Sequence, residues 1–146
     1  RKLITNRFGE ITQVDFAASL QSNLMGHIKM IQNMHPLLND VSHVVNIGSM
    51  AGFMGSVKFP GMSAYAASKA ALHALTECLA VEYTERNIHF NCLALGSAQT
   101  EMLEEAFPGY QSPVMAFEMG KYIADFALTA HKFFNGKVLP VAVTTP

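Results

Sequence analysis

Charged side chains are scarce in this chain: Asp, Glu, Lys and Arg make up 14% of its 146 residues, while 50% are hydrophobic. Because soluble domains average about 25% charged residues, we expect part of the surface to be covered by neighbouring subunits or by a further segment of the same fold. The formal net charge of −1 gives no electrostatic footprint for nucleic acid or for an anionic membrane.

Long hydrophobic runs, clustered cysteines and paired histidines are also missing. No apolar stretch approaches the roughly 18 residues of a membrane-spanning helix, and residues 1–5 do not have the pattern of a signal peptide. Cys78 and Cys92 lie in apolar segments without CxxC spacing, which predicts two buried, reduced thiols and a cytoplasmic location. The six histidines are scattered, and none pairs with another at metal-ligand spacing. The sequence therefore predicts no metal site, no membrane partner and no nucleic-acid partner.

The order of elements predicts an α/β fold with a parallel sheet. A capping-box pattern at 12–15 begins a helix that runs to about Met34, and a longer helix is predicted from Ser63 to about Arg86. Strands are predicted at 43–47, 88–95 and 137–143, and further helices at 101–106 and 115–131. Strands that alternate with helices, without tight hairpins, favour parallel pairing. Because three strands are few for a doubly wound sheet, we expect residues 1–146 to form its second half.

Tyr65 and Lys69 are the residues that point most directly to catalysis. They are four apart in the helix predicted at 63–86, so their side chains lie on one face, one turn apart. A nearby ammonium favours the phenolate and would lower the pKa of a tyrosine below its usual value of about 10. Such a tyrosine could exchange a proton with an alcohol or carbonyl oxygen. The alternative, a packed tyrosine beside a solvated lysine, stays open on this spacing alone.

Four segments, in the same order, resemble the motifs of the short-chain dehydrogenase/reductase (SDR) family, NAD(P)-dependent oxidoreductases with a Rossmann-like fold. Residues 44–52 (VVNIGSMAG) resemble the strand and loop of the catalytic serine, and residues 65–69 (YAASK) match the YxxSK motif. Asn23 matches the asparagine of the preceding helix, and residues 91–100 resemble the N-x-x-x-P-G-x-x-x-T segment. Residues 1–146 are therefore identified as the catalytic C-terminal portion of one SDR domain, half of a doubly wound parallel sheet.

The resemblance implies a role for each matching residue. Tyr65 would exchange a proton with the substrate oxygen while hydride moves to or from nicotinamide, and Lys69 would lower the pKa of Tyr65 and bind ribose hydroxyls. Ser49 would hold the carbonyl or alcohol oxygen, and Asn23 would anchor a water in a proton relay toward Lys69. By themselves, Ser49 could be a simple turn residue and Asn23 a capping or structural residue. Contacts with NAD or NADP are expected from Tyr65, Lys69, Gly96, Ala98 and Thr100.

Two departures from the family pattern are visible. Leu95 stands where the family has proline, and this change would loosen the loop around the nicotinamide. No G-x-G-x-x-G turn precedes a helix, since Gly48, Gly52 and Gly55 lack that spacing. The residues that bind the adenine, the 2′ position and most of the pyrophosphate are therefore expected outside this sequence, which does not separate NAD from NADP. The chain alone is expected neither to fold stably as a monomer nor to bind cofactor.

The sequence predicts the chemical class of the substrate and the type of oligomer, but no individual compound. The loop 53–62 and the segment 101–113 are expected to line the pocket, and their residues favour an apolar or weakly polar small-molecule carbonyl or alcohol: Phe53, Met54, Phe59, Met102, Leu103 and Phe107. The helices predicted at 12–34 and 63–86 resemble the pair at the family's subunit interface, which implies a homodimer or homotetramer.

Two other functions remain open on the sequence. One is a non-catalytic SDR-like fragment or interaction subunit that lacks cofactor binding. The other is a sugar-nucleotide epimerase or dehydratase, which also uses YxxxK but usually carries a larger C-terminal substrate domain than the residues that follow Lys69.

Overall fold

A central buried strand organises the fold. The computed structural model describes residues 3–143. It contains a three-stranded parallel sheet in the order β1-β2-β3, formed by β1 (His43–Ile47), β2 (His89–Leu95) and β3 (Lys137–Val141). Residues 90–94 of β2 are all buried, as expected for the middle strand of a parallel sheet with both faces covered. The predicted strands are confirmed, with β2 beginning one residue later and β3 ending two residues earlier than expected.

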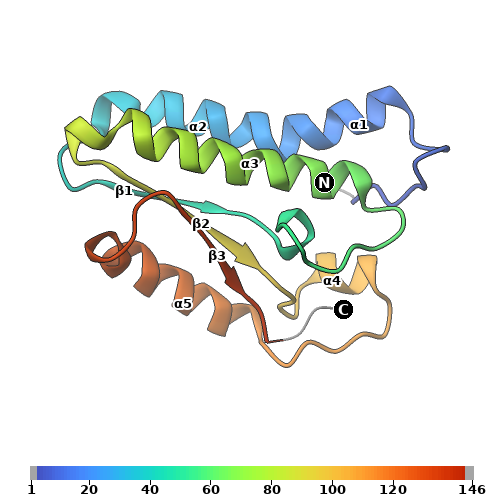
Figure 1. Ribbon diagram of the computed structural model, residues 1–146. Helices are drawn as coiled ribbons and strands as arrows, with labels where there is room; N and C mark the ends of the chain where they lie inside the picture. Colours follow the sequence, from blue (N-terminus) through green and yellow to red (C-terminus); the bar gives the residue numbers. More distant parts are fainter. Residues whose placement is uncertain (1–2, 144–146) are drawn as a thin grey trace.

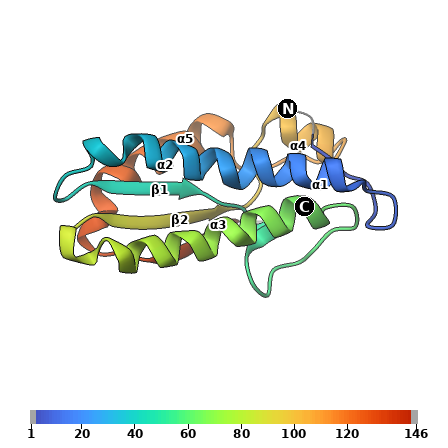
Figure 2. The same cartoon turned by 90° about the horizontal axis from the view of Figure 1, so that it is seen from above.

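Helices cover both faces of the sheet (Figure 1). On one face lie α1 (Gln13–Leu20), a π-helical turn (Gln21–Met25), α2 (Gly26–Met34) and the long α3 (Ser63–Glu82). Figure 2 shows the α1–α2 rod running alongside α3. The opposite face carries α5 (Ala116–Thr129), and α4 (Glu101–Ala106) lies beyond the carboxyl ends of the strands. Short 3-10 turns occupy His35–Leu37, Met50–Gly52, Thr84–Arg86 and Ala130–Lys132.

Alternate side chains of β2 supply the two halves of the core. Phe90 packs with Ile31, Ala80 and Ile88 on the α2–α3 side, whereas Leu93 packs with Phe126 and its neighbours on the α5 side. This division follows from the period-2 alternation of side chains along a strand. Burial of each large apolar side chain stabilises the fold by about 1.5–3 kcal/mol.

Asn91 connects the amino ends of the strands. Its Nδ2 donates to the Phe134 carbonyl and to His43 Nε2, both at 2.9 Å, and its Oδ1 accepts from the Lys137 backbone N–H at 3.0 Å. The first asparagine of the 91–100 motif is therefore structural, at the end of the sheet opposite the carboxyl edge.

Three histidines that are scattered in the sequence meet beside Asn91. The His131 ring lies 5.8 Å from that of His43 and 6.0 Å from that of His89, measured between ring centres. Among residues 3–143, no group of three or more His, Cys, Asp or Glu side chains is arranged to hold a metal ion. No helix in the described part of the chain is both long and apolar enough to cross a membrane.

The expected burial of both cysteines is wrong for one of them. Cys92 is buried, but Cys78 is exposed on α3. Because α3 is apolar around most of its circumference, the sequence pattern does not distinguish its inner face from its outer one. Val81 on the same helix is 76% exposed, and Met30 on α2 is 63% exposed. The α1–α3 layer thus presents apolar side chains to the outside.

Candidate active site

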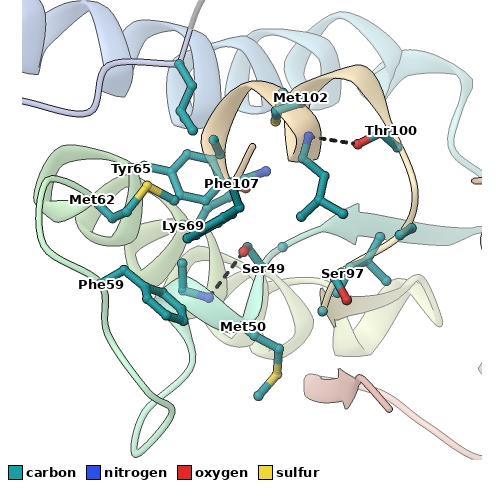
Figure 3. Close-up of a pocket in the computed structure, with 18 of the residues that line it drawn as sticks. Ser49, Met50, Phe59, Met62, Tyr65, Lys69, Ser97, Thr100, Met102 and Phe107 are labelled. Carbon is teal, nitrogen blue, oxygen red and sulfur yellow. Dashed lines mark hydrogen bonds between the residues drawn. The ribbon is translucent and has the colours of Figure 1, made fainter. Parts of the chain in front are cut away.

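Three of the predicted catalytic residues meet at the carboxyl edge of the sheet. Ser49 follows β1, and Tyr65 and Lys69 come from the first turns of α3. They line one cavity of about 320 Å³, together with Gly96, Ala98 and Thr100 from the segment after β2 (Figure 3). Ligands of open α/β sheets bind in this position, outside the carboxyl ends of the strands.

Ser49 is held in a short turn packed against α3. Its Oγ accepts a hydrogen bond from the Ala51 backbone N–H at 3.2 Å, at the start of the 3-10 turn 50–52. A Cβ atom at Gly52 would lie 2.5 Å from the backbone nitrogen of Ala70 and 2.7 Å from the carbonyl carbon of Lys69. Only glycine fits there, so the motif's second glycine is explained by the space between loop and helix.

Lys69 is buried, with 8% of its surface exposed, and its ammonium is directed at the end of β1. Its Nζ donates to the Ile47 carbonyl at 2.7 Å and lies 6.0 Å from the centre of the Tyr65 ring. An ammonium has three donors, so the Ile47 bond leaves others for a ligand. Burial lowers the pKa of Lys69.

The ionisation of Tyr65 differs from the sequence expectation. Burial raises its pKa, and a side-chain hydrogen bond with Ser49 opposes this effect without cancelling it. The expected lowering by Lys69 is not found, because desolvation of the phenolate dominates at this site. Tyr65 is therefore a protonated phenol near neutrality, with its hydroxyl group beside that of Ser49.

Asn23 does not line the cavity but lies between the first helix and α3. It belongs to the π-helical turn between α1 and α2, and its Nδ2 donates to Ser19 Oγ at 3.3 Å and to Ser68 Oγ at 3.2 Å. Ser68, the serine of the YxxSK motif, in turn donates to the Tyr65 carbonyl at 2.7 Å. Asn23 thus connects the first helix to the YxxSK motif of α3. The sequence predicted an uninterrupted helix here, and its apolar spacing gives no sign of the π turn, a feature frequent at functional sites.

The segment after β2 is well ordered by hydrogen bonds although Leu95 replaces the family's proline. The Gly96 backbone N–H donates to the Val141 carbonyl and the Gln99 N–H to the Val114 carbonyl, both at 2.8 Å. Thr100 Oγ1 accepts from the Leu103 N–H at 3.2 Å and so caps α4. These bonds fix the path of the segment in the structure, and the loosening expected from Leu95 stays a prediction.

The wall of the cavity is largely apolar, as predicted, but the set of residues differs. Phe59 and Phe107 contact each other edge to face in this wall, with ring centres 5.2 Å apart, and Met102 and Leu103 also line the cavity. Phe53 and Met54 do not line it: the Phe53 ring packs near that of His73, and Met54 is 93% exposed. Val57 and Met62 also line the cavity, from the loop 53–62 that was predicted to do so, whereas the contribution of Leu3 was not predicted.

Known proteins resemble this chain in sequence over most of its length. The sequence model of the short chain dehydrogenase family matches residues 3–111. A tropinone reductase homolog of Arabidopsis thaliana is 35% identical over 146 residues, covering 90% of this chain and 54% of the relative. A 3-oxoacyl-[acyl-carrier-protein] reductase of Aggregatibacter actinomycetemcomitans is 32% identical over 109 residues, covering 70% of this chain and 43% of the relative. The chain thus spans about half the length of these two curated relatives.

Solved structures resemble it in fold. A short chain dehydrogenase from Burkholderia cenocepacia, in complex with NADP, superposes with a TM-score of 0.82 at 26% identity, over 95% of this chain and 60% of that one. The three-stranded sheet and its helices are thus part of a Rossmann-type fold. With the family's motifs gathered at the carboxyl edge of this sheet, the chain belongs to the short-chain dehydrogenase family.

Proposed function

We propose that the full-length protein is an NAD(P)-dependent oxidoreductase in which Tyr65 exchanges a proton with a carbonyl or alcohol substrate. The observation that carries this proposal is the convergence of Ser49, Tyr65 and Lys69 on one apolar cavity. Family membership adds support, since the relatives described above include reductases.

The residues present fit the nicotinamide end of a dinucleotide. Lys69 offers a buried ammonium whose donors are not all used by Ile47, which suits ribose hydroxyls. Gly96, Ala98 and Thr100 line the same cavity along a segment ordered by hydrogen bonds, which suits a carboxamide. When bound, the cofactor supplies or accepts the hydride.

Ser49 and Tyr65 handle the oxygen of the substrate. The Ser49 oxygen accepts from the Ala51 N–H, so its own hydrogen can point at the substrate oxygen and polarise the carbonyl. The raised pKa of Tyr65 keeps its proton in place until negative charge develops on that oxygen, which then receives the proton. A protonated tyrosine suits carbonyl reduction, and alcohol oxidation requires bound groups that favour the phenolate.

Asn23 supports this site from behind. Its bonds to Ser19 and Ser68 fix the π turn against the motif of α3. From this place it anchors a water between the helices that passes protons toward Lys69.

The substrate is an apolar or weakly polar carbonyl compound or alcohol. Lys69 is the only charged side chain among the described residues that line the cavity. Its ammonium donates to the Ile47 carbonyl, and its other donors bind the ribose in this proposal, so no charged group is left for the substrate. Phe59, Phe107 and three methionines (Met50, Met62 and Met102) belong to the remaining wall, and methionine side chains adapt to irregular shapes.

Removal of the Tyr65 hydroxyl tests the proposed chemistry. In the full-length protein, Tyr65→Phe should lower turnover of a small apolar ketone by about 100-fold or more, because the proton donor is lost while the buried ring remains. Consumption of NADH or NADPH measures the rate, and circular dichroism checks the fold. Tyr122→Phe, on the exposed surface of α5, is the matched control and should keep full activity. Rates within a few fold of wild type for Tyr65→Phe would refute the assignment.

The apolar outer face of α1–α3 is the subunit interface of a homodimer or a homotetramer. Light scattering of the full-length protein should therefore give a mass at least twice that of the monomer. Val81→Glu places a charge on this face, where the side chain is 76% exposed, and should shift the mass toward the monomer. Leu128→Glu on α5, where the side chain is 74% exposed, is the control and should leave the mass unchanged. A wild-type protein that is monomeric at micromolar concentration contradicts this interface.

Residues 1–146 by themselves should not bind the cofactor measurably. The pyrophosphate of a dinucleotide is gripped by backbone N–H groups at a Gly-rich turn and a helix N-terminus, and this sequence contains no such turn. Titration calorimetry of the isolated chain with NADH and NADPH checks this expectation. Micromolar binding would show that the 146 residues form a complete cofactor site.

A further inference from the structure

His73 is a buried titratable residue that the proposed chemistry leaves without a role. It follows Lys69 by one turn of α3, and only 7% of its surface is exposed. Within residues 3–143, its Nε2 atom is buried and has no hydrogen-bond partner. The ring fills the space between α3 and the loop that carries Ser49.

The ring contacts that loop on both sides of Ser49. On one side, a Cβ atom at Gly48 would lie 2.4 Å from His73 Nε2, so the imidazole rests directly on the Gly48 backbone. On the other side, the Gly52 backbone lies close enough to raise the pKa of the imidazole, and the Phe53 ring lies 6.4 Å away, edge on. One side chain of α3 therefore contacts the residue before Ser49 and the turn after it.

The surroundings keep this imidazole neutral. Burial and the nearby charge of Lys69 lower its pKa, Lys58 of the loop acts in the same direction, and the Gly52 backbone opposes them. From β2, the Cys92 thiol faces the same glycine, and burial raises its pKa to about 11, so it carries no negative charge near neutrality. A neutral imidazole has one N–H and one lone pair. Because Nε2 has no partner among the described residues, we assign the N–H to Nδ1, the nitrogen that is left for the Gly52 backbone.

We propose that His73 is a positioning residue. Its contacts hold the Ser49 turn against α3, and so fix the position of the Ser49 hydroxyl relative to Tyr65 and Lys69. Three reacting groups on two elements need such a connection, because a misplacement of about 1 Å costs about 100-fold in rate. The inference rests on the proposed function, since Ser49 must act on the substrate for its position to matter.

A double-mutant cycle in the full-length protein tests the inference. His73→Leu keeps most of the volume and removes the N–H assigned to the Gly52 side, and it should lower kcat by about 10- to 100-fold. In a Ser49→Ala background the same change should alter kcat by less than about twofold, because residues that act through one another are not additive. His73→Asn keeps a donor near the place of Nδ1 and should recover most of the wild-type kcat. If His73→Leu does not fold, His73→Gln, whose donor lies further out, takes its place in the cycle.

A control on the same helix separates positioning from general support of the fold. Thr76 is buried and accepts from Asn46 Nδ2 at 2.9 Å. Thr76→Val should change kcat by the same small factor in both backgrounds. The inference is overturned if His73→Leu lowers kcat by the same factor with Ser49 and with Ser49→Ala, or if His73→Leu keeps the wild-type kcat. It is also overturned if His73→Asn is as slow as His73→Leu. If Ser49→Ala and Tyr65→Phe both leave turnover intact, the proposed function itself has failed.

Discussion

The close approach of the loop 48–53 to α3 is the constraint on which the candidate site depends. The loop comes directly from β1, and α3 begins only after a further excursion of the chain, so nothing local in the sequence holds them together. Contact is possible because Gly52 has no side chain where the Ala70 backbone lies. Through this contact, a serine from the end of a strand reaches the tyrosine and lysine of a helix.

The apolar surroundings of the site set the ionisation of its residues. Burial raises the pKa of Tyr65 and lowers that of Lys69, so each group is displaced toward its neutral form. A low dielectric also strengthens the interaction of a donor with charge that develops in a reaction. The same wall of phenylalanine and methionine therefore favours an apolar substrate and a protonated tyrosine.

Much of this architecture could be predicted from the sequence, because the informative patterns are local. The i, i+4 spacing of Tyr65 and Lys69 places both on one helix face, and the β-branched run at 43–47 marks the strand that ends before Ser49. What could not be predicted depends on tertiary packing. The outward position of Cys78 could not be predicted because α3 is apolar around most of its circumference. The raised pKa of Tyr65 comes from desolvation by residues distant in the sequence. The close approach of the His73 ring to Gly48 is likewise visible only when loop and helix are side by side.

The contact at Gly52 can be tested by the addition of one methyl group. In Gly52→Ala the new Cβ would lie 2.5 Å from the Ala70 nitrogen, so the loop must move away from α3 and carry Ser49 with it. A methyl group at Gly120 meets no atom within 4 Å, so Gly120→Ala is the matched control on α5. Turnover of an apolar ketone by the full-length protein should fall by about 10- to 100-fold in the first variant and stay within about twofold of wild type in the second. A Gly52→Ala protein with wild-type turnover would contradict the account.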